Sequence, residues 1–239
     1  MVEIDATGLG FDELGRILRA TDEDVTVRNC LGQRFIAAGR KAWRVDVHGV
    51  PGNALGAYLD GALVEVFGNA QDAVGDTMND GTIVVHGSIG DTAGYAMRGG
   101  SIYVKGDAGY RAGIHMKQYR DKEPALVIGG RTGSFLGEYQ AGGIIIVLGL
   151  CGRGPIVGNF PCTGMHGGKL FLRSTCDCVT FPEQVTARPA SEDDMVSISG
   201  YLETFCECFG YALDDVLSGP FTVVTPDSRN PYTQMYVAN

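Results

Sequence analysis

The chain has 239 residues, of which 36 are glycine, and its formal net charge is −9 at pH 7. Glycine is about twice as frequent as the roughly 7% of an average protein, whereas the 44% of apolar residues is typical of a globular fold and excludes a disordered chain. The acidic excess argues against non-specific binding to nucleic acid, and no apolar run reaches the roughly 18 residues that a membrane span needs.

The first residues predict a helix that covers one end of the fold. Leu14, Ile17 and Leu18 recur at helical spacing within residues 11–20. The N-terminus lacks the basic and apolar segments of a secretory signal. The chain has seven cysteines, an odd number, and it is large enough to fold without disulfides, so the thiols are expected to be reduced. We therefore expect residues 1–21 to form a helical cap, and a cytoplasmic protein with reduced thiols.

Residues 22–182 contain a repeat that explains the glycine content. A Gly-x-Ile-x-Val-x-Gly pattern occurs in its clearest form at residues 81–87, 100–106 and 143–149. Weaker copies lie on both sides, and the residue that closes each copy recurs mostly every 19 residues. The closing positions are Asn29, Gly49, Gly68, Gly87, Gly106, Gly130, Gly149 and Ser174.

Each copy predicts one short strand followed by two bends. Alternating apolar residues give the strand one inward face, and further glycines, usually three and seven residues after the closing one, permit a positive φ angle or a close approach of two backbones. A repeat of about 19 residues is too short for a βαβ unit or a propeller blade, which need roughly 30 and 40. We therefore predict an all-β fold, a single-stranded right-handed parallel β-helix of about seven to eight coils with short helical caps.

The segment 183–239 departs from the repeat. The Ser-Glu-Asp-Asp run at residues 191–194 is a helix-start signal, and a helix is expected over residues 195–211. Apolar residues at 221–224 predict a short strand. The segment is acidic, and two roles stay open for it: a polar cap, which solenoids require, or an acidic docking surface.

Two long steps in the repeat locate insertions at residues 114–124 and 151–167. Insertions in solenoids become loops, often on a binding face. The first lies in a local basic patch, because residues 91–131 contain seven Lys and Arg against four Asp and Glu. Such a patch suits an acidic partner, an anionic cofactor or a carboxylate substrate; a solvated loop is the alternative.

The histidines of these insertions are the main candidates for chemistry. His115 and His166 lie one in each insertion, and with Glu138 or Cys162 they would form an acid–base site if the stacked coils brought them together. Two hydrogen-bonded loop histidines are the alternative. The candidate contacts for a partner or ligand are Arg111, His115, Lys117, Glu138 and His166.

Other reactive groups are absent or weak in the sequence. A class II glutaminase uses the α-amino group of an N-terminal cysteine as its base, whereas this chain begins with Met1. The Cys-x-Cys pairs at residues 176–178 and 206–208 have a one-residue spacer that strains a tetrahedral zinc site, and thiols packed in a strand suit the first pair better. We expect no catalytic, cofactor-binding or metal-ligating residue in this chain.

Four runs of the sequence resemble the GXGXG family. They are GYAMRGG at residues 94–100 and the segments 109–117, 136–143 and 163–168. That family forms the C-terminal right-handed β-helix domain of the glutamate synthase large subunit, and it also occurs as a stand-alone chain. Related branches are one of the subunits of formylmethanofuran dehydrogenase and a component of N-methylglutamate synthase.

The resemblance implies a non-catalytic scaffold. Glutamate synthase converts glutamine and 2-oxoglutarate to two glutamates, and its other domains hold the FMN and the iron–sulfur cluster. The implied partners are therefore glutaminase and FMN-dependent synthase subunits, with no nucleic acid and no membrane. A formylmethanofuran dehydrogenase component and an independent enzyme at the His115 and His166 loops stay open as alternatives, as does self-association through a flat β-helix face.

Overall fold

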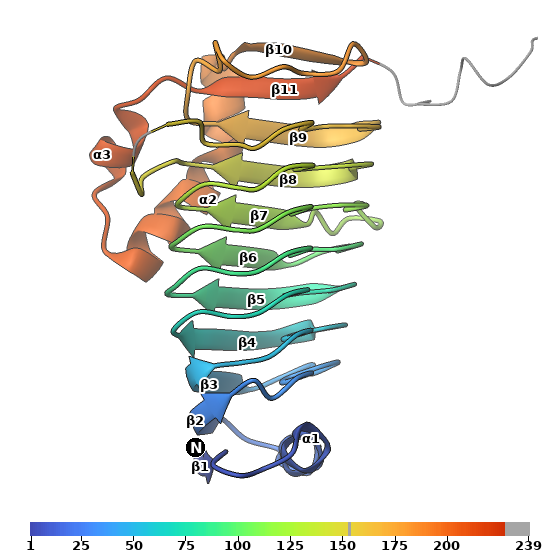
Figure 1. The fold of residues 1–239 in the computed structure, drawn as a ribbon, viewed down its shortest axis with the longest axis vertical. Coiled ribbons are helices and arrows are strands. Elements are labelled where there is room, and N and C mark those ends of the chain that lie inside the picture. The colour runs from blue at the N-terminus through green and yellow to red at the C-terminus, as the bar shows by residue number, and fades with distance from the viewer. Residues whose placement is uncertain (153, 228–239) are drawn as a thin grey trace, which may run out of the picture.

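The computed structural model describes residues 1–152 and 154–227, and one sheet runs the length of the molecule (Figure 1). Its strands, in spatial order, are β1 (Val2–Asp5), β2 (Val25–Leu31), β3 (Arg44–Val50), β4 (Asp60–Phe67), β5 (Asp80–Val85), β6 (Ser101–Val104), β7 (Ala125–Ile128), β8 (Ala141–Val147), β9 (Gly167–Leu172), β11 (Thr222–Pro226) and β10 (Val185–Pro189). From β1 to β9 the strands are parallel and follow chain order. The predicted β-solenoid is confirmed, with about eight turns.

Ladders of apolar side chains fill the interior of the solenoid. The strand register places Ile83 beside Ile102, and the same ladder continues through Leu126 to Ile145 and Leu170. All five side chains have no exposed surface. One coil cannot bury its inward face alone, so each ladder position depends for its burial on its neighbours in the stack.

The glycines of the repeat serve two different geometric needs. A Cβ atom at Gly68 would lie 2.5 Å from the carbonyl oxygen of Gly49 in the preceding coil, so this strand-closing position admits no side chain. Gly113, seven residues after a closing glycine, has a φ angle of +71° instead, and a Cβ there would lie 2.3 Å from Cδ1 of Ile145. Gly68 therefore meets a close approach of two backbones, whereas Gly113 combines left-handed backbone with a close approach to a side chain of β8.

Short polar side chains also join successive coils. The Asp72 carboxylate accepts a hydrogen bond from the backbone N–H of Asp91 at 2.9 Å, and Asp91 in turn accepts from the N–H of Tyr110 at 2.8 Å. A parallel series runs from Asn69 to the N–H of Ser88 at 2.8 Å. These ladders satisfy backbone N–H donors at the bends. The repeat pattern in the sequence does not predict them.

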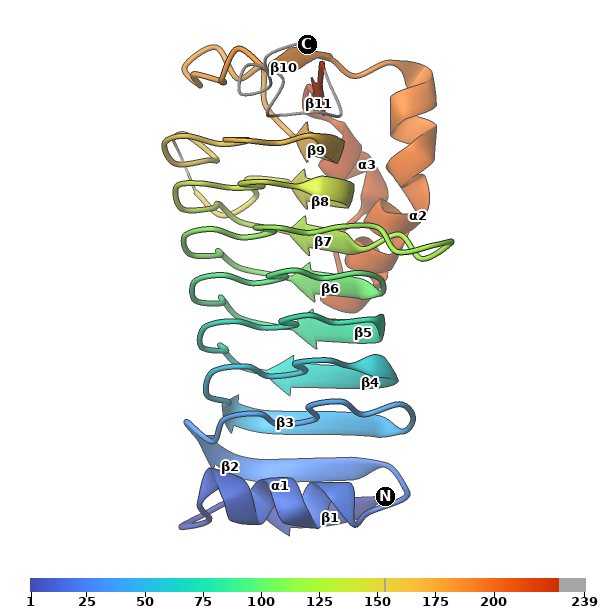
Figure 2. The ribbon, with the colours of Figure 1, turned by 90° about the vertical axis from the view of Figure 1, so that its right-hand side faces the viewer.

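The outer face of the sheet is partly covered by the C-terminal helices. Figure 2 shows α2 (Glu192–Phe209) and α3 (Leu213–Leu217) lying against this face. A second apolar cluster forms there, in which Phe205 of α2 packs with the outward side chains of the strands, including Val127, Ile146 and Phe171. Strands β7 and β8 are therefore buried on both faces, beyond the single inward face that the repeat predicts.

Both ends of the solenoid carry additional elements. The predicted N-terminal helix forms as α1 (Phe11–Arg19) and buries Leu14 and Leu18. The sheet begins earlier than expected, because β1 pairs with β2 in parallel. At the other end, β11 and β10 continue the sheet with antiparallel pairing, and β11 covers most of the strand expected at residues 221–224.

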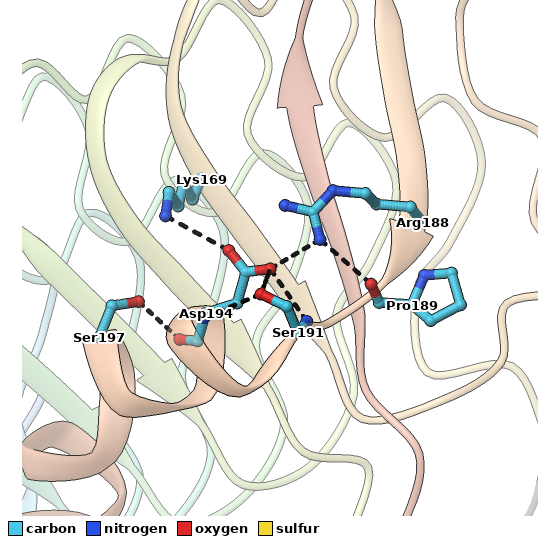
Figure 3. A network of polar contacts seen from close by, with 6 residues as sticks. All are labelled: Lys169, Arg188, Pro189, Ser191, Asp194 and Ser197. Carbon is cyan, nitrogen blue, oxygen red and sulfur yellow. Dashed lines mark hydrogen bonds and ion pairs between the residues drawn. The ribbon is translucent and has the colours of Figure 1, made fainter.

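A buried carboxylate anchors the start of α2, close to the predicted helix-start signal (Figure 3). Asp194 accepts hydrogen bonds from the Ser191 hydroxyl at 2.8 Å and from Arg188 of β10 at 2.6 Å, and Lys169 of β9 lies 3.5 Å away. The Arg188 hydrogen bond, together with those from Ser191, holds the pKa of Asp194 well below its usual range. This one side chain therefore links α2 to two strands of the sheet.

We expect glycine-to-alanine changes to have opposite effects at two sites. Gly68→Ala brings a methyl group against the preceding backbone and should lower the free energy of unfolding by about 1–3 kcal/mol. The matched control, Gly200→Ala, is exposed within α2 with no atom within 4 Å of the new Cβ, and should raise stability by about 0.5–1 kcal/mol. Thermal unfolding followed by circular dichroism checks both signs, and equal effects would contradict the close-approach requirement.

We expect Asp194→Asn to lower the free energy of unfolding by about 1–2 kcal/mol at pH 7, because the substitution weakens the helix cap and removes the ion pairs with Arg188 and Lys169. A depressed folded-state pKa stabilises the fold above the unfolded value of roughly 3.9, and this contribution disappears as pH falls through the folded pKa. Urea unfolding of both proteins at pH 7 and near pH 3 is the measurement. The difference between them should shrink at the lower pH, and a pH-independent difference would contradict the assignment.

Candidate functional site

The bends of successive coils place His115 and Tyr139 directly above one another. Both residues have left-handed backbone, with φ angles of 55° and 53°. The N–H of His115 donates to Glu138 O at 2.9 Å, and the N–H of Tyr139 donates to Thr163 O at 2.8 Å, so they occupy equivalent positions in neighbouring coils. Their rings stack with centroids 5.2 Å apart and an angle of 9° between planes.

A pocket of about 560 Å³ opens beside this ring pair. It is lined by His115, Lys117, Gln118, Tyr139, Ala141, Gly142, His166, Gly167 and Gly168. Three of the five residues singled out from the sequence, His115, Lys117 and His166, therefore lie together. Nothing in the linear sequence indicates that proximity, because different coils and both insertions contribute.

The other two predicted residues lie together beside the pocket rather than in its lining. Arg111 donates from Nε to Glu138 at 3.1 Å, and its guanidinium lies 5.0 Å from the ring centroid of Phe135. The Glu138 carboxylate is thus directed to a cation and not toward the histidines. Cys162 is fully buried, and burial raises the pKa of its thiol to about 12, so it stays protonated.

Backbone forms much of the pocket floor. A Cβ at Gly142 would lie 2.7 Å from Gln118 N, and one at Gly168 would lie 2.5 Å from Nε2 of Gln140. The amide of Gln140, which has no exposed surface, donates to the carbonyl oxygens of Gly142 and Gly143 and so holds this turn. Sequence reasoning missed Gln118, Tyr139 and Gln140 as site residues. Only Tyr139 has a signal in the sequence: it follows the closing residue Gly130 at the same distance at which His115 follows Gly106.

The first insertion forms a small antiparallel turn joined at Tyr119 and Lys122, which projects beside α2 in Figure 2. Lys122 pairs with Asp80 at 2.8 Å, and Tyr201 of α2 donates to Glu123 at 3.4 Å. Part of the predicted basic patch is therefore neutralised by the body of the solenoid. Arg120 is exposed, with its guanidinium over the Tyr119 ring.

Comparison with known proteins identifies the family. The GXGXG motif family matches residues 19–225, which include β2 to β9 and the C-terminal helices. The chain belongs to the GXGXG family. A protein of Methanocaldococcus jannaschii, described as uncharacterized, is 42% identical over 250 aligned residues, covering 98% of this chain and 96% of that relative.

The described residues of this GXGXG chain contain neither a metal-binding cluster nor a membrane-spanning helix. No group of three or more His, Cys, Asp or Glu residues there is arranged to hold a metal ion. None of the helices in residues 1–152 and 154–227 is long and apolar enough to cross a bilayer.

The cysteines of the GXGXG chain occupy contrasting environments. Cys176 is buried and Cys178 is exposed, and both lie in a turn after β9, so the expectation of two thiols on one face of a strand is wrong. Cys206 and Cys208 lie on α2, and burial raises the pKa of both thiols. The turn replaces the strand because the chain leaves the last coil to begin the C-terminal segment.

We expect alkylation of the native GXGXG chain to separate these thiols. Cys151 and Cys178 are exposed and should react first with iodoacetamide, whereas Cys30 and Cys162 should stay protected, because burial removes access and raises the pKa of each thiol, to about 11 and about 12. Peptide mass spectrometry after timed labelling measures the order. Added zinc should leave the labelling of Cys178 unchanged, and zinc protection would reveal a metal site.

Proposed function

We propose that this protein is a structural subunit of a glutamate-synthase-like amidotransferase complex, in which partner chains carry the glutaminase, FMN and iron–sulfur chemistry. The observation that carries the proposal is the extent of the family match, which covers residues 19–225 and therefore most of the solenoid. The internal design suits a scaffold, because both apolar clusters are used to hold coils and helices together.

The surface of the solenoid offers features that suit protein partners. Exposed aromatic side chains, which are enriched in protein interfaces, occur at bends of several coils. They are Phe35, Tyr58, Tyr95, Tyr110 and Phe160, each at least 40% exposed. The turn at Tyr119 and Arg120 adds a projecting aromatic and a cation, next to α2.

Purification of the full chain from its native host tests the proposal. We expect a class II glutaminase chain and an FMN-binding synthase chain to co-purify at near-native salt. Recovery of molybdopterin-enzyme subunits would instead move the protein to a formylmethanofuran dehydrogenase complex. Recovery of the chain alone would contradict both complexes and favour an independent protein.

The insertion provides a matched pair of variants for that experiment. Arg120→Glu should reduce recovery of the partners by about tenfold, because a rim charge of the wrong sign opposes association. Arg16→Glu makes the same charge change on the exposed side of α1, at the N-terminal end of the stack and several coils from the insertion, and should leave recovery unchanged. Equal losses would show a general charge effect, and no loss in either variant would exclude the insertion as the contact.

A further inference from the structure

The pocket beside His115 and Tyr139 has an unusual charge for this molecule. The chain carries a net charge of −9, yet within the part of the chain that the structure describes no Asp or Glu lines this pocket, and Lys117 does. The nearest predicted carboxylate, Glu138, is engaged by Arg111. A local cationic hollow in an acidic protein concentrates small anions.

Several polar side chains of the pocket have unused hydrogen-bonding capacity. Among the described residues, no ion pair or side-chain hydrogen bond engages the Lys117 ammonium, the Tyr139 hydroxyl or the Gln118 amide. The His166 ring is oriented by a contact of 3.0 Å between Nδ1 and Gly164 O, which leaves Nε2 available. The Lys117 ammonium, the Tyr139 hydroxyl and the Gln118 amide are donors that carboxylate and phosphate oxygens accept from, whereas Nε2 of His166 donates only in the imidazolium form, because Nδ1 donates to Gly164 O.

The pocket is also held in shape before any ligand arrives. The Tyr139 ring lies between His115 in one coil and Gly164 in another, where a Cβ would lie 2.4 Å from the ring. Buried Gln140 fixes the glycine turn of the floor. Pre-formed geometry lowers the entropic cost of binding, and Gly142 and Gly168 lie so close to Gln118 and Gln140 that neither position admits a Cβ.

From these observations we infer that the pocket binds a small oxyanion, a carboxylate or a phosphate, through Lys117 with Tyr139 and the two imidazoles as further polar contacts. This inference rests on the geometry of the pocket alone and does not depend on the proposed scaffold role. It assigns a ligand site to the bend of the solenoid, where the two insertions meet.

Histidine NMR signals provide a direct test, because the chain has only four histidines. His115 and His166 line the pocket, whereas His48 and His86 stack on either side of Phe67, away from the pocket, and serve as internal controls. The full chain is titrated separately with 2-oxoglutarate and with inorganic phosphate, up to about 10 mM. Sodium chloride at matched ionic strength is the reference.

We expect His115 and His166 to shift in a saturable manner while His48 and His86 stay in place. A response to 2-oxoglutarate alone identifies a carboxylate site, and a response to phosphate alone identifies a phosphate site. Lys117→Gln should weaken binding about tenfold, and Lys105→Gln, which removes a lysine outside the pocket, should not. Unchanged His48 and His86 signals show that the variant is folded.

Four results would overturn the inference. They are the absence of saturable shifts with either anion, the same shifts with sodium chloride, equal affinity in the wild type and Lys117→Gln, and an equal loss of affinity in Lys105→Gln, which would reduce the effect to overall charge. Partner recovery in the co-purification experiment is measured independently, so either proposal can fail without the other.

Discussion

The distance between adjacent strands governs the whole structure. Parallel strands hydrogen-bond at roughly 4.8 Å, and in a solenoid the bends must keep nearly the same separation as the strands. At Gly68 the spacing leaves no room for a Cβ against the preceding carbonyl. The same spacing lets the Asp72 carboxylate reach the backbone N–H one coil away. Glycine content, polar ladders and apolar ladders are three consequences of one repeat distance.

This constraint explains why the fold could be predicted from the sequence. A period of mostly 19 residues fixes strand register, so the ladder from Ile83 to Ile145 follows from alignment of the copies. The second buried face does not follow, because the repeat alone says nothing about a helix that returns along the sheet. The continuous apolar run at residues 144–148 was the available signal, since strands buried on both faces lose their alternation.

The candidate site shows where sequence information ends. Both histidines stand out as residues of insertions, but their proximity depends on how each insertion leaves and rejoins its coil. Tyr139 occupies the bend position of His115 in the next coil, and only the register of the bends shows that their rings stack. The pairing of Arg111 with Glu138 likewise joins residues of different coils. Local spacing predicts the elements, whereas contacts between bends require the stack.

The division between coil and bend also locates function in this fold. Strand positions are restricted by packing, and closing positions inside the stack, such as Gly68, are restricted by backbone approach, so a larger side chain there disturbs the stack. Several bend positions with left-handed backbone carry alanine, threonine, arginine, histidine or tyrosine in different coils, so they accept side chains that the closing position Gly68 does not. The solenoid therefore separates the residues that maintain its geometry from those that meet other molecules. The cationic pocket and the exposed aromatic residues both arise at the bends for that reason.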